Sequence, residues 1–173
     1  KGTFGILGNI VNTLYIIVIT LMIAVPVGVG SAIYLNEYAK PGRLVRSIEF
    51  TTEILSGIPS IIFGLFGMVV FGKVLGLSYS VLTGSFTLTL MVLPLITRNT
   101  QEALRTVPDS YRSGALGIGA TKWYMIRTIL LPSAAPGILT GIILSVGRIV
   151  GESAALLFTA GSDFRLPRNL FSK

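Results

Sequence analysis

Cysteine and histidine are both absent from this sequence of 173 residues. Their absence excludes disulfide scaffolds, thiol nucleophiles, zinc sites that use these ligands and catalytic triads built on histidine. Charged residues are also scarce: they make up 12% of the chain, against about 25% in soluble domains. What remains in abundance is apolar sequence, because 51% of the residues are hydrophobic. These features predict an all-α integral membrane protein.

The net charge of +7 could indicate a nucleic-acid-binding protein, but the apolar content argues against one. We expect the basic residues to anchor cytoplasmic loops and to bind anions. Residues 12–35 form an apolar run that is too long for the hydrophobic region of a signal peptide, and no clear cleavage site follows it. We therefore expect a membrane span there and no signal peptide.

Four stretches are long and apolar enough to cross a bilayer as helices, which takes about 20 residues each. We predict spans over residues 9–35, 53–76, 80–105 and 133–159, in a single transmembrane domain that covers residues 1–173. Pro26, Pro59 and Pro94 fall within three of these spans and predict kinks or breaks. Residues 37–52 predict a loop and a short amphipathic helix at the membrane surface.

The distribution of lysine and arginine predicts the orientation. Two loops are basic, and because an even number of spans separates them, they lie on the same side of the membrane. The positive-inside rule places that side in the cytoplasm, so we expect a multi-pass protein of the inner membrane. The basic residues of these loops are Lys40, Arg43, Arg46, Arg105, Arg112, Lys122 and Arg127.

Two further arginines lie inside predicted spans, where a charge costs roughly 2.5–3.5 kcal/mol on insertion scales. Arg98 lies about 12 Å and Arg148 about 22 Å inside the cytoplasmic ends of their helices, at 1.5 Å per residue. They thus bracket the midplane of a hydrocarbon core that is about 30 Å thick. Glu102 and Glu152 follow these arginines at i+4 and can pair with them across one helical turn.

Guanidinium groups bind oxyanions through two parallel hydrogen bonds. We therefore predict that Arg98 and Arg148 line a substrate pathway, with Glu102 and Glu152 as the partners that hold them. The alternative is that these glutamates or nearby carbonyl groups already neutralise both arginines, or that Arg98 extends to the cytoplasmic surface.

The longest polar interruption, residues 106–132, predicts two short helices. Pro108 followed by Asp109 favours a helix start, and glycines follow that would end this helix. Thr121 is a candidate N-cap for a second helix that runs to Pro132. This segment is either a rigid projection into the cytoplasm or an ordinary linker at the membrane surface.

The residues of this loop resemble the "EAA" loop of bacterial ABC importer permeases, whose pattern is Glu-Ala-Ala-x3-Gly-x9-Ile-x-Leu-Pro. Ala115, Gly119, Ile129, Leu131 and Pro132 match the pattern, whereas the first two positions carry serine and glycine. The resemblance implies a type I ABC importer permease-like helix bundle with a coupling helix that docks into a groove of a cytoplasmic ATPase. The coupling residues that it implies are Asp109, Tyr111, Ser113, Gly114, Ala115, Gly119 and Ala120.

Residues 32–38, 55–66, 97–100 and 147–160 are similar to the PstA-type permeases of phosphate importers. This resemblance implies that phosphate is the substrate and that the matching arginines, Arg98 and Arg148, belong to its path. The implied partners are a PstC-like sister permease, two ATPase subunits that use ATP and Mg, and an extracytoplasmic phosphate-binding protein. No cofactor is expected on this chain. Family members usually have six spans, so we expect the first and last family helices to be missing from these four.

Other functions stay open. A permease for another oxyanion or small solute would keep the coupling loop, whereas a passive channel or a structural membrane subunit would not need one. An intramembrane enzyme would need paired carboxylates or a nucleophile with a base, and no such set shares a helix face, so we expect no catalytic activity. Residues 67–73 fit the start of a P-loop, but Val74 takes the place of its Ser/Thr, and we expect no nucleotide there.

Overall fold

The computed structural model describes residues 5–152, with side chains from Ile10 onward, and every regular element in this range is a helix. The first long helix, α1 (Gly5–Ile33), continues as a π-helix, η1 (Tyr34–Tyr38). Helix α2 (Arg43–Gly57) is followed by α3 (Ser60–Gly67) and a second π-helix, η2 (Met68–Val74). The chain then forms α4 (Val81–Thr106) and α5 (Asp109–Gly117). A continuous helix of α6 (Lys122–Met125), η3 (Ile126–Leu130) and α7 (Leu131–Gly151) completes the described fold.

Three of these helices are long and apolar enough to span a membrane: Ile10–Tyr38, Val81–Thr106 and Lys122–Gly151. The helix pair Arg43–Gly57 and Ser60–Val74 would supply a fourth span, but it is bent by 103°. Within the described residues, the fold therefore agrees with the predicted all-α membrane protein of about four spans.

The predicted span over residues 53–76 is wrong as a single helix. Helix α2 ends at Gly57, Ile58 is extended (φ −73°, ψ 134°), and a new helix begins at Ser60. The cause is Pro59, which lacks an N–H donor and disfavours helical geometry in the residue before it. The break that Pro59 predicted is thus confirmed. The predicted surface helix is longer than expected and takes the first residues of this span.

The span predicted over residues 133–159 begins earlier in the structure. The helix starts at Lys122 and runs through Pro132, which follows directly after the π-helical segment η3, where the backbone hydrogen-bond pattern of the helix changes. Helix α7 ends at Gly151, and Glu152 follows in an extended conformation (φ −87°, ψ 106°). Residues 153–159 of this prediction lie outside the described residues.

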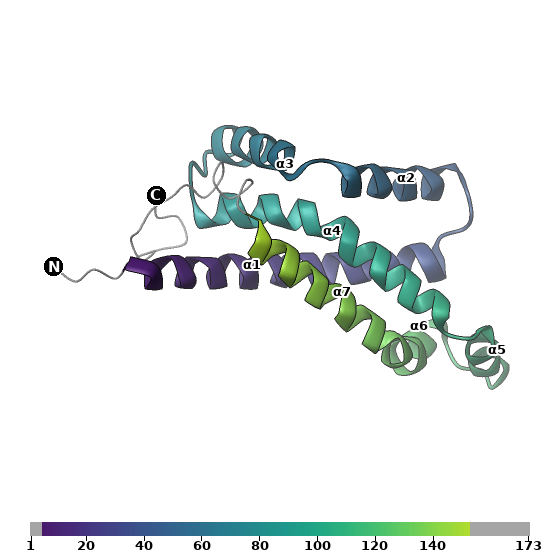
Figure 1. Ribbon diagram of the computed structural model, residues 1–173. Helices are drawn as coiled ribbons and strands as arrows, with labels where there is room; N and C mark the ends of the chain where they lie inside the picture. The colour runs from purple at the N-terminus through teal and green to yellow at the C-terminus, as the bar shows by residue number, and fades with distance from the viewer. Residues whose placement is uncertain (1–4, 153–173) are drawn as a thin grey trace.

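Helix α4 is the central element, with α1 on one side, α2 and α3 on another, and α7 crossing it (Figure 1). Its buried hydroxyl groups donate to carbonyls of the preceding turn, as Thr87 does to Thr83 and Thr89 does to Ser85. These bonds satisfy the hydroxyls inside the apolar core without a partner helix. The core residues around α4 are Ile16, Ala24, Phe63, Leu88, Met91, Val92, Ile96 and Ile149.

Small residues let α7 approach α4 closely. A Cβ atom placed on Gly137 would lie 2.6 Å from the Cβ of Ala103, and one placed on Gly141 would lie 2.7 Å from that of Asn99. Such spacing of small residues is typical of helix pairs in membranes. Since residue numbers rise on one helix as they fall on the other, these two contacts also set an antiparallel register.

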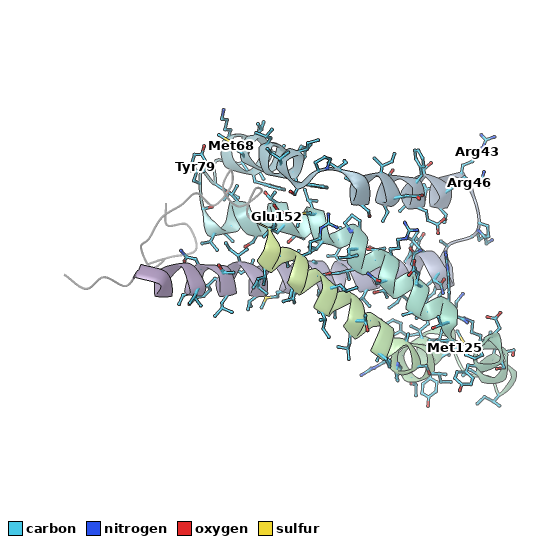
Figure 2. The ribbon with its side chains drawn as sticks, in the orientation of Figure 1. Arg43, Arg46, Met68, Tyr79, Met125 and Glu152 are labelled. Carbon is cyan, nitrogen blue, oxygen red and sulfur yellow. The ribbon has the colours of Figure 1, made fainter. Side chains whose placement is uncertain are left out.

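The α1–α2 connection and α5 lie at the same end of the bundle, on the right in Figure 1. Figure 2 labels Arg43 and Arg46 at that end, and Met125 beside α6 and α5. The prediction that the two basic loops share a side is therefore confirmed.

Candidate substrate pathway and coupling surface

Helix α5 has the start and the end that the sequence predicted. Pro108 holds the N-cap position and Asp109 begins the helix. Gly119 has a φ of +83°, a left-handed conformation that favours glycine, although no atom lies within 4 Å of the place of its Cβ. The Thr121 hydroxyl then accepts a hydrogen bond from the Tyr124 N–H and caps α6. The backbone thus presents α5 as a short, well-delimited helix.

The outer surface of α5 and the turn after it carries large apolar side chains. Tyr111 is 49% exposed, Leu116 52% and Ile118 85%. An exposed apolar patch of this kind is typical of a contact with another protein or with the membrane surface. Among the predicted coupling residues, Ala115 is buried and Ala120 is half-buried, whereas the exposed ones are Asp109, Tyr111, Ser113, Gly114 and Gly119.

The most extensively bonded arginine of the described region is Arg112, which sequence reasoning used only to predict orientation. Its Nη2 donates to Glu37 Oε1 and to the Leu104 carbonyl, both at 2.9 Å. Its Nη1 donates to the Val107 carbonyl and to Asp109 Oδ1, both at 3.0 Å. Its Nε donates to the same Glu37 carboxylate at 3.3 Å. We call Arg112, Glu37, Asp109 and these two carbonyls the Arg112 clasp.

Two of the three charges of this clasp are largely removed from solvent, whereas the Asp109 side chain is 97% exposed. The Glu37 side chain is 5% exposed and that of Arg112 is 19% exposed. The hydrogen bond to Glu37, and then the charge of that carboxylate, raise the pKa of Arg112, so the guanidinium stays protonated at any pH that the protein meets. The signal in the sequence was an acidic residue, Glu37, at the end of an apolar helix whose following loop is otherwise basic.

A polar cleft of about 210 Å³ separates α2 from α4. Arg98 Nε lies 3.5 Å from Glu102 Oε1, which confirms the predicted i+4 pair. Arg105 Nη2 donates to Glu49 Oε1 at 3.2 Å and so joins α4 to α2. Gln101 also lines this cleft, and its Nε2 has no hydrogen-bond partner among the described residues. The lining residues are Glu49, Thr52, Glu53, Arg98, Gln101, Glu102 and Arg105.

The α2–α4 cleft contains two arginines and three glutamates, so its formal charge is −1 (2 − 3). Both arginines contact a carboxylate in this conformation. An anion would have to displace Glu102 from Arg98 before it could bind there. Both side chains of that pair are more than half exposed, so the displacement requires little desolvation.

Arg148 occupies the last turn of α7 and is half-buried. The helix ends at Gly151, one residue before Glu152, which Figure 2 labels at the opposite end of α7 from Met125. The pair of Arg148 with Glu152 was predicted for two residues of one helix, but the helix ends before Glu152. The pairing itself stays a prediction.

Arg98 does not lie on the face of α4 that packs against α7. Helix α7 packs on the face of α4 that carries Asn99 and Ala103, whereas Arg98 opens into the α2–α4 cleft. The register set by Gly141 and Asn99 places Arg148 level with residue 92 of α4, about 9 Å along the helix axis from Arg98. The two arginines thus occupy successive levels of the bundle.

Comparison with known proteins gives three related findings. Residues 24–171 match the family described as the inner membrane component of binding-protein-dependent transport systems. The chain is 41% identical to the probable ABC transporter permease protein YqgI of Bacillus subtilis, over 91% of this chain and 53% of that protein. It is 36% identical to the phosphate transport system permease protein PstA of Xylella fastidiosa, over 96% of this chain and 58% of that protein.

Among solved structures, the chain is similar to the inward-facing MetNI methionine ABC transporter, with 27% identity and a TM-score of 0.69. This match covers 87% of the chain and 70% of the matched structure. The chain spans about half the length of the curated relatives that it matches.

Proposed function

The chain belongs to the family of inner membrane components of binding-protein-dependent transport systems, and we propose that it is a permease subunit of an ATP-driven phosphate importer. Its fold class is that of the helical permeases of ABC importers, and its role is that of a non-catalytic, multi-pass component of the inner membrane. The substrate, the partners and the transport cycle below are parts of the proposal.

The observation that carries the proposal is the geometry of α5. This short helix lies at the end of the bundle that holds both basic loops, and it exposes Tyr111, Leu116 and Ile118. A helix of this kind supplies a ridge for the groove of a partner protein. We assign this helix to the coupling with two ATPase subunits, which bind and hydrolyse ATP with Mg. The P-loop-like residues 67–73 of this chain are not expected to bind a nucleotide, so the proposal places ATP binding in these partner subunits.

In the proposed cycle, ATP closes the two ATPases and displaces α5. The displacement moves the helices of this permease and of its PstC-like sister between inward-open and outward-open states, as a rigid-body change driven by differential binding. An extracytoplasmic binding protein delivers phosphate to the outer side. Arg98 and Arg148 then lower the barrier for an oxyanion at successive levels, while Glu102 and Glu152 hold the arginines between substrates.

A second candidate is a permease of the same design for another small solute. The observation that favours it is the α2–α4 cleft, where three carboxylates outnumber two arginines. Such a cleft suits a zwitterion or another solute that carries a positive group at least as well as it suits phosphate.

Uptake by the reconstituted complex separates these functions. The full-length permease, its sister, the ATPases and the binding protein are placed in vesicles, and labelled phosphate uptake is followed with ATP, with sulfate and methionine as competitors. We expect ATP-dependent uptake that unlabelled phosphate inhibits and that Arg148→Gln abolishes while the complex still assembles. ATP-dependent uptake of labelled methionine, without ATP-dependent uptake of labelled phosphate, would favour the second candidate. Normal phosphate uptake by Arg148→Gln would refute the role of this arginine.

A further inference from the structure

The Arg112 clasp joins three segments that are distant in the sequence. Glu37 comes from η1, at the end of α1, while the Leu104 and Val107 carbonyls come from the end of α4. Arg112 itself lies in α5. A cation at this position also complements the partial negative charge at the C-terminal end of α4. A single guanidinium thus holds the ends of α1 and α4 to the proposed coupling helix.

The covalent connections of α5 show why the bond to Glu37 matters. Along the chain, α5 is linked directly to α4 through residues 107–108, and to α7 through α6 and η3. Its packing beyond the clasp is also against α6 and η3. Helix α1 has no such connection to α5, because α2, α3 and α4 lie between them in the sequence. The polar link from α5 to the end of α1 is therefore the contact of Arg112 with Glu37, beside the apolar packing of Ile33 against the cluster that contains Ala115.

The burial of this contact indicates that it persists when α5 moves. The Glu37 side chain is 5% exposed, and it accepts hydrogen bonds from both Nε and Nη2 of Arg112. Opening the contact would leave the Glu37 carboxylate with the Asn36 amide as its hydrogen-bond partner but without a compensating positive charge, which is unfavourable at a buried site. The matched contrast is Arg105 with Glu49, an interhelical pair whose side chains are 60% and 43% exposed.

We propose that Arg112 is a positioning residue that makes α5 move as one body with the adjacent ends of α1 and α4, so that force on α5 reaches α1 directly. This role rests on the proposed function, because it requires a partner that displaces α5. It adds to that function a defined route: the ATPase moves α5, and the clasp carries α1 along with α4 in the same step.

Arg112→Gln and Glu37→Gln test this route in the reconstituted full-length complex. Phosphate uptake and ATP hydrolysis are measured in the same vesicles and divided by the amount of assembled complex. We expect each variant to transport roughly tenfold less phosphate per ATP, a typical size for a coupling effect, while hydrolysis stays within about twofold of wild type. Arg46→Gln is the control, because Arg46 is an exposed arginine at the same end of the bundle and lies outside both the clasp and the lining of the α2–α4 cleft, and its ratio should stay within about twofold of wild type.

A crosslink separates positioning from folding. The chain has no cysteine. The double variant Glu37→Cys with Arg112→Cys therefore introduces a single pair of cysteines into it. Without a linker, we expect ATP hydrolysis with poor uptake. A short bis-maleimide linker that joins the two cysteines should restore phosphate uptake per ATP. The two single-cysteine variants should not respond to this reagent.

Three outcomes would overturn the role of Arg112. One is an unchanged ratio of uptake to hydrolysis in both glutamine variants. Another is a double-cysteine protein that transports when free and stops when crosslinked, since the clasp would then have to open in each cycle. The third is a wild-type complex without ATP-dependent uptake of any solute, which would overturn the proposed function itself and the route that rests on it. A crosslink that restores uptake supports the role even if Arg112→Gln fails to assemble.

Discussion

The Arg112 clasp and the α2–α4 cleft use the same chemical groups in opposite ways. In the cleft, Arg98 pairs with a glutamate of its own helix, and both side chains are more than half exposed. In the clasp, Arg112 bonds to three segments, and its partner Glu37 is almost completely buried. The first arrangement leaves a charge that solvent and ligands can reach. The second commits the charge to holding helices together.

This contrast bears on how arginines are interpreted in membrane proteins. An arginine inside a predicted span attracts attention because of its insertion cost. In this chain, however, Arg112 lies in the short helix α5, outside the predicted spans, and connects more segments than Arg98 does. A structural role is indicated better by the burial of a charged group and by the number of helices that it joins. The position of the residue within a predicted span is a weaker indicator.

The largest expected effect comes from reversing a charge in the clasp. Glu37→Lys would place a second cation against Arg112 in a buried site, and breaking a buried pair costs about 3–5 kcal/mol. We expect the full-length protein to lose most of its folded yield and much of its thermal stability in detergent. Glu49→Lys, the same change at the exposed pair with Arg105, should lower stability by about 1 kcal/mol or less. Equal losses would contradict the distinction between the two regions.

A smaller effect is expected at the end of α5. Gly119→Val would place a branched side chain at a φ of +83°, which costs about 1–2 kcal/mol. Because the turn after α5 would shift, we also expect a lower rate of ATP-dependent uptake at normal membrane levels. Gly114→Ala is the control, since Gly114 is helical with open space around it and alanine there should stabilise the helix by about 0.5–1 kcal/mol. Thermal unfolding of the purified protein measures both changes, and a stable Gly119→Val would show that the turn can adopt another conformation.

The smallest effect is expected within the cleft. A double-mutant cycle with Arg98→Ala and Glu102→Ala should give a coupling energy of about 0.3–0.5 kcal/mol, which salt should reduce further. The cycle is measured by thermal unfolding at low and high ionic strength. A salt-independent coupling energy of several kcal/mol would mean that this pair is sequestered, and the cleft would then resemble the clasp.

The sequence predicted best those features that depend on neighbouring residues. Pro108, Gly119 and Thr121 act through their own backbone geometry or through adjacent N–H groups, so the bounds of α5 and α6 followed from local chemistry. The pair of Arg98 with Glu102 was predictable for the same reason, since one helical turn separates them.

Features that depend on tertiary structure were less predictable. Hydropathy places residues 53–76 in one apolar stretch, and it does not show that the chain bends by 103° at Pro59. The contact of Arg112 with Glu37 joins residues that are 75 positions apart, so no local pattern indicates it. Likewise, the sequence could not show that Arg98 faces α2 while α7 packs on another face of α4.

The most direct test of the account is phosphate uptake per ATP hydrolysed, measured for Arg112→Gln and Arg98→Gln in parallel over a series of phosphate concentrations in the reconstituted complex. We predict that Arg112→Gln lowers this ratio at every concentration, because force no longer reaches α1. We predict that Arg98→Gln raises the phosphate concentration for half-maximal uptake and leaves the ratio at saturation unchanged. The same response from both variants, or an unchanged ratio in Arg112→Gln, would contradict the division between a substrate cleft and a coupling clasp.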